Sequence, residues 1–290
     1  MARPPRRFTH PSRATTKPRQ SSLRSHVLRA RREQQGADLA HTEAAEAAVL
    51  RRSVKAARVR VLATGEVLTV RAGDLWHVMP GHVVTLVLKR RWRHLGHLYG
   101  EGELRDARID VPALGLPPLQ LEERGLLEVA GARTAYEMEQ VLPWTKPGSN
   151  FDPILIAVER KQRGDIRGAV LLLMDLLTEE LRCLDAHGHL GNLVFQTHPE
   201  HALIHYEIGV AIGEHALGSG FVGALPWSYF DNRPFLRCLH AQGLALWRLG
   251  HLEKAASVFE RLLWLDPADG QGAGRLLAEV KAGRPWAEES

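Results

Sequence analysis

Two hydrophobic patterns divide this chain. Between residues 58 and 112, apolar and polar residues alternate in the runs RVRVLA, EVLTVRA, DLWHV, GHVVTLVLKRRW, HLYGEGEL and ARIDV. This alternation places successive side chains on opposite faces and is typical of half-buried β-strands. The pairs Thr64-Gly65 and Pro80-Gly81 lie between runs, where hairpins turn. We therefore predict a small antiparallel β-barrel over residues 58–112, either SH3-like or OB-like, since spacing does not reveal strand order.

From residue 151 to residue 283 the apolar positions recur at helical spacing, and the pattern repeats. The run ILIAVERKQRGDIRGAVLLLMDLL contains a helix, a Gly-Asp turn and a second helix, and similar units follow it. Ala169 and Ala202 are 33 residues apart, whereas Ala202 and Ala255 are 53 apart, which leaves room for one repeat and an insertion. We predict a helical repeat domain over residues 151–283 that ends in a capping helix.

The remaining segments show neither pattern clearly. Residues 1–57 begin rich in Pro, Arg and Ser, and we expect a basic, largely disordered region with a marginal helix after residue 22. This composition fits a disordered arm, an organellar transit peptide or a misassigned start equally well. Residues 113–150 hold Pro and Gly at intervals, which predicts a linker. The predicted fold is α+β and multidomain, with the barrel preceding an α-helical solenoid.

The clearest repeat unit is GLALWRLGHLEKAASVFERLLWLDPADGQG, residues 243–272. Its small and aromatic residues stand at fixed offsets: Gly243, Gly250, Ala255, Phe259 and Pro267. Gly243 permits a close helix approach, Gly250 makes a turn, and Pro267 stops the second helix. This unit resembles a tetratricopeptide repeat (TPR), and weaker units extend the resemblance over residues 150–283.

The TPR resemblance implies a groove that is lined by the first helix of each unit and binds an extended or helical peptide. The positions carried over by offset are Lys161, Asn192, Phe195, Arg237, His240, Trp247 and Arg248. Such a mixture of cations and rings suits an acidic or carboxylate-bearing segment. For each residue, the alternative is an ordinary packing or surface role. Our leading hypothesis is a non-enzymatic scaffold protein that binds a peptide segment of a partner protein.

The charge distribution supports an alternative function. The net charge is +5, but residues 1–32 hold ten Lys and Arg and no acid, so the remainder of the chain is acidic. In the predicted barrel, Lys89, Arg90, Arg91 and Arg93 surround Trp92. Strand alternation puts Arg90 with Trp92 on one face and Arg91 with Arg93 on the other. Small barrels bind single strands by stacking bases on aromatic rings in a basic groove. The alternative is thus a nucleic-acid-binding protein whose repeats recruit a partner.

No pattern indicates an enzyme, a cofactor or a metal site. GSGFVG imitates a dinucleotide-binding motif but follows a predicted helix rather than a strand. His201 and His205 share a helical face, but no Cys or carboxylate accompanies them. Cys183 and Cys238 are predicted to be buried free thiols in a reducing cytoplasm. Because no apolar run reaches the ~20 residues that cross a bilayer, we expect a cytoplasmic protein without membrane contact.

Overall fold

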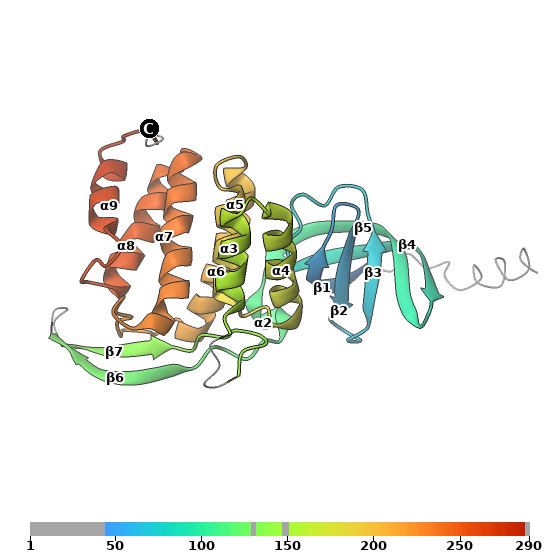
Figure 1. The fold of residues 1–290 in the computed structure, drawn as a ribbon, viewed down its shortest axis with the longest axis horizontal. Helices are drawn as coiled ribbons and strands as arrows, with labels where there is room; N and C mark the ends of the chain where they lie inside the picture. Colours follow the sequence, from blue (N-terminus) through green and yellow to red (C-terminus); the bar gives the residue numbers. More distant parts are fainter. Residues whose placement is uncertain (1–43, 129–131, 147–150, 288–290) are drawn as a thin grey trace, which may run out of the picture. The chain divides into compact units, whose positions relative to one another are not determined.

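The computed structural model of the chain describes residues 44–128, 132–146 and 151–287. Its first part is a closed barrel of β1 (Ala44–Arg52), β2 (Ala56–Val61), β3 (Val67–Arg71), β4 (His82–His94) and β5 (His97–Ile109) (Figure 1). The strands are ordered β1-β2-β3-β5-β4, and β4 also pairs with β1. The predicted barrel is confirmed. The prediction that all its strands are antiparallel is wrong, because β5 pairs with β3 in parallel.

The first strand lies where the sequence predicted part of a marginal helix. Its residues AAEAAVLRR have the helix propensity of alanine, but β1 pairs with both β2 and β4, and tertiary pairing overrides local propensity. Both faces are buried, since Ala47 and Val49 belong to the barrel core while Ala48 packs with Val83 and Leu114. The predicted helix is therefore wrong over residues 44–57, since β2 begins at Ala56 and residues 53–55 are not helical. The remainder of that prediction, up to residue 43, lies outside the described residues.

Two further strand predictions differ from the structure. DLWHV, residues 74–78, is a loop rather than a strand, and its Leu75 and Val78 fill the barrel core from that loop. HLYGEGEL and ARIDV were predicted to be two strands, but His97–Ile109 is one strand that pairs with β4 along its length. A bulge at Asp106, whose φ is 52°, bends this strand and lets it continue around the barrel.

The segment predicted to be a linker, residues 113–150, contains regular structure in its described parts, 113–128 and 132–146. They contain the end of α2 (Val111–Leu114) and the hairpin of β6 (Leu121–Leu127) and β7 (Arg133–Met138). Tyr136 N donates to Ala224 O over 2.9 Å, and Met138 N donates to Oδ1 of the buried Asn232 over 2.7 Å. These bonds fasten β7 to the insertion between α6 and α7. Among the described residues of this segment, Gly115 ends α2 with a φ of 65°, so a glycine here marks the end of a helix in packed structure.

The second part is the predicted helical region, which is confirmed as helical. Its elements are α3 (Pro153–Gln162), α4 (Ile166–Glu179), α5 (Leu184–Val194), α6 (Pro199–Leu217), the 3₁₀ turn η2 (Phe230–Asn232), α7 (Arg233–Arg248), α8 (Leu252–Leu265) and α9 (Ala273–Lys281). Consecutive helices pack against each other, and Gly164 and Gly250 turn the chain with φ of 82° and 79° (Figure 1). None of the described helices is long and apolar enough to cross a membrane.

Two helix pairs are held together by the same contact between a glycine and an aromatic ring. A Cβ on Gly191 of α5 would lie 2.3 Å from Cε1 of Tyr206 on α6. A Cβ on Gly243 of α7 would lie 2.5 Å from Cε1 of Phe259 on α8. Both rings are fully buried, so neither can move aside at low cost. The close approach predicted at Gly243 thus occurs in two successive helix pairs.

The barrel packs against the helices through an ion pair and beside buried histidines. The barrel is joined to α4 by an ion pair between Arg51 and Asp175, 2.7 Å apart. His187 on α5 and His205 on α6 are almost fully buried, 6.4 Å apart between ring centroids. Neither Nδ1 atom has a hydrogen-bond partner among the described residues. Burial lowers the pKa of His187 and that of His82 to about 4.

We expect Gly191→Ala to destabilise the protein by about 1–3 kcal/mol, because the added methyl group overpacks the helix interface against Tyr206. Gly188→Ala on the same helix is the matched control. Its Cβ would meet only Cys238 Sγ at an ordinary 3.5 Å, so this change should be neutral or stabilising. Urea unfolding of both variants measures the difference. Equal stability of the two would contradict the proposed packing.

Stability should fall as the pH is lowered from 7 to 4. A histidine with a pKa of 6.5 when unfolded and about 4 when folded binds its proton more readily in the unfolded chain. His187 alone should therefore cost about 3 kcal/mol of stability at pH 4 relative to pH 7. Urea unfolding across this range measures the slope for wild type and for His187→Gln, which should have the flatter slope. Equal slopes of stability against pH in wild type and His187→Gln would contradict the lowered pKa of His187 in the folded protein.

Candidate functional site

Four side chains form a row across four neighbouring strands of the barrel. The register pairs Arg58 with Thr69, Thr69 with Tyr99, and Tyr99 with Trp92. Directly paired residues point to the same side of a sheet. The alternate residues of these strands, such as Val59 and Leu68, fill the barrel core. The row from β2 through β3 and β5 to β4 therefore lies on the outer surface of the barrel.

Aromatic rings and cations meet at the β4 end of this row. The Trp92 and Tyr99 rings stack, with centroids 5.9 Å apart and planes inclined by 14°. The guanidinium carbons of Arg90 and Arg71 lie 5.2 and 5.9 Å from the Trp92 ring centroid. His94 adds an edge contact to Tyr99 at 6.5 Å. We call the surface of Arg58, Thr69, Arg71, Arg90, Trp92 and Tyr99 the aromatic face.

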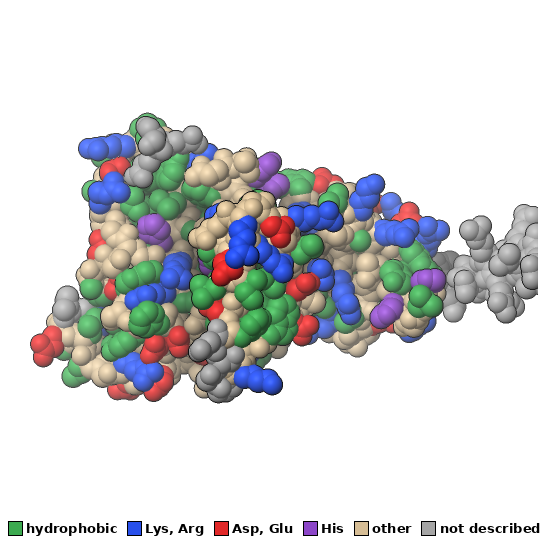
Figure 2. All heavy atoms as spheres, viewed as in Figure 1, with side chains coloured by type: hydrophobic (Ala, Val, Ile, Leu, Met, Phe, Trp, Pro, Cys, Tyr) green, Lys and Arg blue, Asp and Glu red, His purple; other side chains and the backbone are tan. Residues whose placement is uncertain are grey.

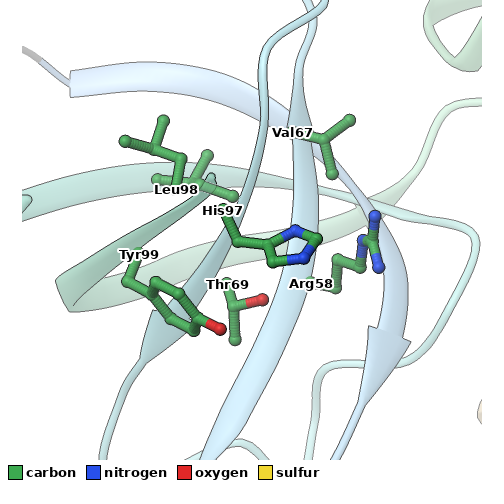
Figure 3. Close-up of a pocket in the computed structure, with 7 residues that line it drawn as sticks. Arg58, Val67, Thr69, His97, Leu98 and Tyr99 are labelled. Atoms are coloured by element: carbon green, nitrogen blue, oxygen red, sulfur yellow. The ribbon is translucent and has the colours of Figure 1, made fainter. Parts of the chain in front are cut away.

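A shallow cavity of about 210 Å³ opens beside the aromatic face. Figure 3 shows its lining, in which Arg58, Thr69, His97 and Tyr99 direct their side chains toward a common space. Val67, Leu68 and Leu98 complete the wall. The cavity thus offers a ring, a hydroxyl, an imidazole and a guanidinium, which can hold a planar group and an anionic group side by side.

The five residues of the predicted basic cluster are divided between two sides of the hairpin. Arg90 and Trp92 belong to the aromatic face. Arg91 and Arg93 both approach Glu66, at 3.4 and 3.9 Å. Lys89 lies 2.8 Å from Glu103, whose pKa is held at about 2 by hydrogen bonds from Lys89 and Arg105. The cluster thus contributes one cation and one ring to the aromatic face.

Charge is distributed unevenly between the two parts of the chain. Residues 44–109 hold twelve Lys and Arg against six Asp and Glu, whereas residues 110–290 hold sixteen against twenty-four. In Figure 2, Lys and Arg side chains gather over the barrel, with His among them. The barrel is therefore basic although the chain beyond the first 32 residues is acidic as a whole. A basic surface with partly exposed rings is the kind that attracts polyanions.

Most of the aromatic face was not predicted from the sequence. The sequence singled out residues 89–93 but not Arg58, Thr69, Arg71 or Tyr99. These residues become neighbours only through the pairing of β2 with β3 and of β3 with β5. The run HLGHLYGEG did place an aromatic residue opposite a basic strand across a short turn. That hairpin was the one signal in the sequence that could have identified Tyr99.

The residues predicted to line a helical groove are divided between two cavities. Asn192 and Arg237 line a cavity of about 490 Å³ between α3, α5 and α7. Phe195, His240 and Trp247 line another, of about 920 Å³, between α5, α7 and α9. The remaining two, Lys161 and Arg248, line neither cavity. In the first cavity the buried Asp185 carboxylate accepts from Gln140 Nε2 at 2.7 Å and lies 3.5 Å from the Arg237 guanidinium.

Among the predicted groove residues, Trp247 and Arg248 are engaged by other parts of the chain. Trp247 is only 6% exposed, and its Nε1 donates to Arg284 O over 2.8 Å. Arg248 Nη1 donates to Phe195 O at 3.0 Å and to Gln196 Oε1 at 2.7 Å, near the C-terminal end of α5. Both residues therefore support the fold. They cannot be substituted as simple surface contacts.

Within residues 44–128, 132–146 and 151–287, no group of three or more His, Cys, Asp or Glu is arranged to hold a metal ion. The two histidines of the HALIH segment do not present a shared metal-binding face. His205 is buried, whereas His201 stacks on Trp76 at 5.4 Å and on His198 at 5.1 Å. Cys183 and Cys238 are both buried free thiols, and burial raises the pKa of Cys183 to about 12.

Comparison of the chain with protein-family models and with curated proteins finds no match.

We expect Trp247→Ala to lower the stability of the protein by about 3 kcal/mol, because it removes a buried ring and the hydrogen bond to Arg284. Trp76→Ala, at a ring that is 49% exposed, is the matched control and should cost less than 1 kcal/mol. Thermal and urea unfolding measure both. A Trp247 variant as stable as wild type would contradict a structural role for this ring.

Proposed function

We propose that this protein is a non-enzymatic single-stranded nucleic-acid-binding protein, which binds through the aromatic face of its barrel and recruits a partner protein through its helical region. The observation that carries the proposal is the stacked pair of Trp92 and Tyr99, flanked by Arg71 and Arg90 on a basic barrel. The peptide-binding scaffold predicted from the sequence is the second part of this function. Its two central residues, Trp247 and Arg248, are used inside the fold.

The aromatic face has the groups that single-strand binding requires. A base stacked on an aromatic ring contributes about 1–3 kcal/mol, and every base has a planar face that can stack. Arg58 and Arg71 on β2 and β3 can contact phosphates on either side of a stacked base. The row of four strands spans about 14 Å, so a short run of nucleotides could lie across it. This geometry supports binding with little sequence preference.

The position of the aromatic face favours the OB-like alternative over the SH3-like one. In OB barrels the face of strands 2 and 3 and the connection between strands 4 and 5 bind oligonucleotides. Arg58 and Thr69 lie on β2 and β3, and the turn at Leu95 and Gly96 connects β4 with β5. The aromatic face thus occupies the surface that such barrels use. This likeness is one of architecture, and the side chains described above carry the proposal.

Existing ion pairs on the hairpin are compatible with phosphate binding. Arg90 pairs with Glu101 at 2.6 Å, but both side chains are about half exposed, at 67% and 46%. Exposed pairs of this kind contribute about 0–1 kcal/mol, so a phosphate can replace the carboxylate at small cost. Release of counterions from the nucleic acid adds a salt-dependent gain. Binding should therefore weaken steeply as salt rises.

The helical region supports recruitment of a partner through a TPR-like arrangement. The supporting observations are the repeated glycine–ring contacts of Gly191 with Tyr206 and of Gly243 with Phe259, which fit stacked helix pairs. The cavities between α3, α5, α7 and α9 lie along the first helices of those pairs. Such cavities are where repeat proteins of this type bind segments of other proteins.

The full-length protein should bind fluorescein-labelled oligo(dT) and oligo(U) in a polarisation assay at low salt. Trp92→Ala should weaken binding about 5- to 100-fold, because a stacking platform is lost. Trp76→Ala, which removes an exposed ring elsewhere, should bind like wild type. The double variant Arg58→Ala, Arg71→Ala should reduce the slope of log K against log salt by about 1.4.

A second charge-matched control is Arg163→Ala, Arg275→Ala, which removes two exposed cations from helical positions. It should leave both the affinity and the salt slope unchanged. Wild-type affinity in the Trp92 variant, or equal losses in the barrel and helical double variants, would refute the aromatic face as the binding site. Residues 1–32 are kept in all proteins, so that their ten cations contribute equally.

A further inference from the structure

The C-terminal segment of the described chain forms part of the wall of the larger helical cavity. After α9, Gly283 turns the chain with a φ of 71°, and Arg284 N donates to Glu279 O over 3.1 Å. The residues that follow, 284–287, form one wall of the cavity of about 920 Å³. Phe195 at the end of α5, and His240 and Trp247 of α7, line the same cavity, and the segment packs against Phe195 and Trp247. The segment is therefore positioned as a bound peptide would be.

The contacts of this segment are of a kind that another chain can reproduce. Trp247 Nε1 donates to the backbone carbonyl of Arg284 over 2.8 Å, and a carbonyl is present in any residue. The Trp286 ring meets the Trp247 ring edge to face at 5.3 Å and the Phe195 ring at 5.8 Å. Pro285 lies between Arg284 and Trp286, and it restricts the backbone of Arg284 to extended conformations. The contacts that hold the segment are thus made by a backbone carbonyl and an aromatic ring, with a proline between these two residues.

The segment also has a defect as an occupant. Nε1 of Trp286 is buried and has no hydrogen-bond partner among the described residues. A buried donor without an acceptor weakens the contact that contains it. A ring of similar shape without this donor would fill the same space without the penalty. The site is therefore occupied by a replaceable segment that is not optimal.

We propose that this cavity is a binding site for an extended Pro-aromatic segment of a partner protein, and that Arg284-Pro285-Trp286 is a built-in competitor that the partner displaces. The inference rests on the second part of the proposed function, recruitment by the helical region, and is independent of the barrel. A partner is favoured over a second copy of this chain. An identical segment in trans cannot outcompete one held at a high effective concentration by its own chain.

The test compares three proteins: the full chain, a variant ending at Gly283, and the full chain with Trp286→Ala. The probes are fluorescein-labelled peptides GRPWAEES, with the native sequence of residues 283–290, GRPFAEES and GRPAAEES. Fluorescence polarisation should show that the shortened variant binds GRPFAEES at least tenfold more tightly than the full chain does. GRPFAEES should bind more tightly than GRPWAEES, and GRPAAEES should show no saturable binding.

The Trp286→Ala protein keeps the rest of the segment. It tests the same prediction if the shortened variant does not fold. It should also bind GRPFAEES more tightly than the full wild-type chain. A folded variant that fails to bind, or equal affinity in all three proteins, would overturn the proposal. Wild-type dimers that dissociate on Trp286→Ala would instead assign the site to a second copy. Oligonucleotide affinity should be the same in all three proteins, so failure of this site and failure of the barrel are distinguishable.

Discussion

Closure of the barrel by β1 is the interaction on which the rest of this structure depends. β1 pairs with β2 on one side and with β4 on the other, so the sheet has no free edge at this point. Ala47 faces the barrel core, while Ala48 faces Val83 and Leu114 on the opposite side. The same strand carries Arg51, which contacts Asp175 of α4. β1 thus curves the sheet and anchors it to the helices.

Closure also explains why the aromatic face exists. In the strand order β1-β2-β3-β5-β4, β5 lies between β3 and β4 and runs parallel to β3. Tyr99 of β5 therefore lies between Thr69 of β3 and Trp92 of β4. In a wholly antiparallel meander β5 would not lie beside β3, and this row would not form. The bulge at Asp106 allows β5 to bend along this path. The candidate site is therefore a consequence of topology more than of any one motif.

Pairing between strands that are distant in the sequence limits what the sequence could predict. Period-two and helical patterns predicted a barrel and a helical region, since each pattern reports burial of one face. β1 was missed because alanine is small enough for burial on both sides, and its helix propensity gave the stronger local signal. Repeat offsets placed Trp247 on the first helix of its unit. They could not show that Arg284 returns to accept its hydrogen bond. Long-range contacts of this kind leave no local pattern.

The uneven charge of the chain decides how strongly its own carboxylates compete with a nucleic acid. Glu66, Glu101 and Glu103 lie beside the hairpin cations, but all three are partly exposed, between 36% and 46%. Water and salt screen such pairs, whereas a nucleic acid presents a row of phosphates whose counterions are released on binding. The barrel keeps a surplus of six cations after its own acids are counted. Glu101 therefore holds Arg90 beside the Trp92 ring, and the local carboxylates do not cancel the attraction for a polyanion.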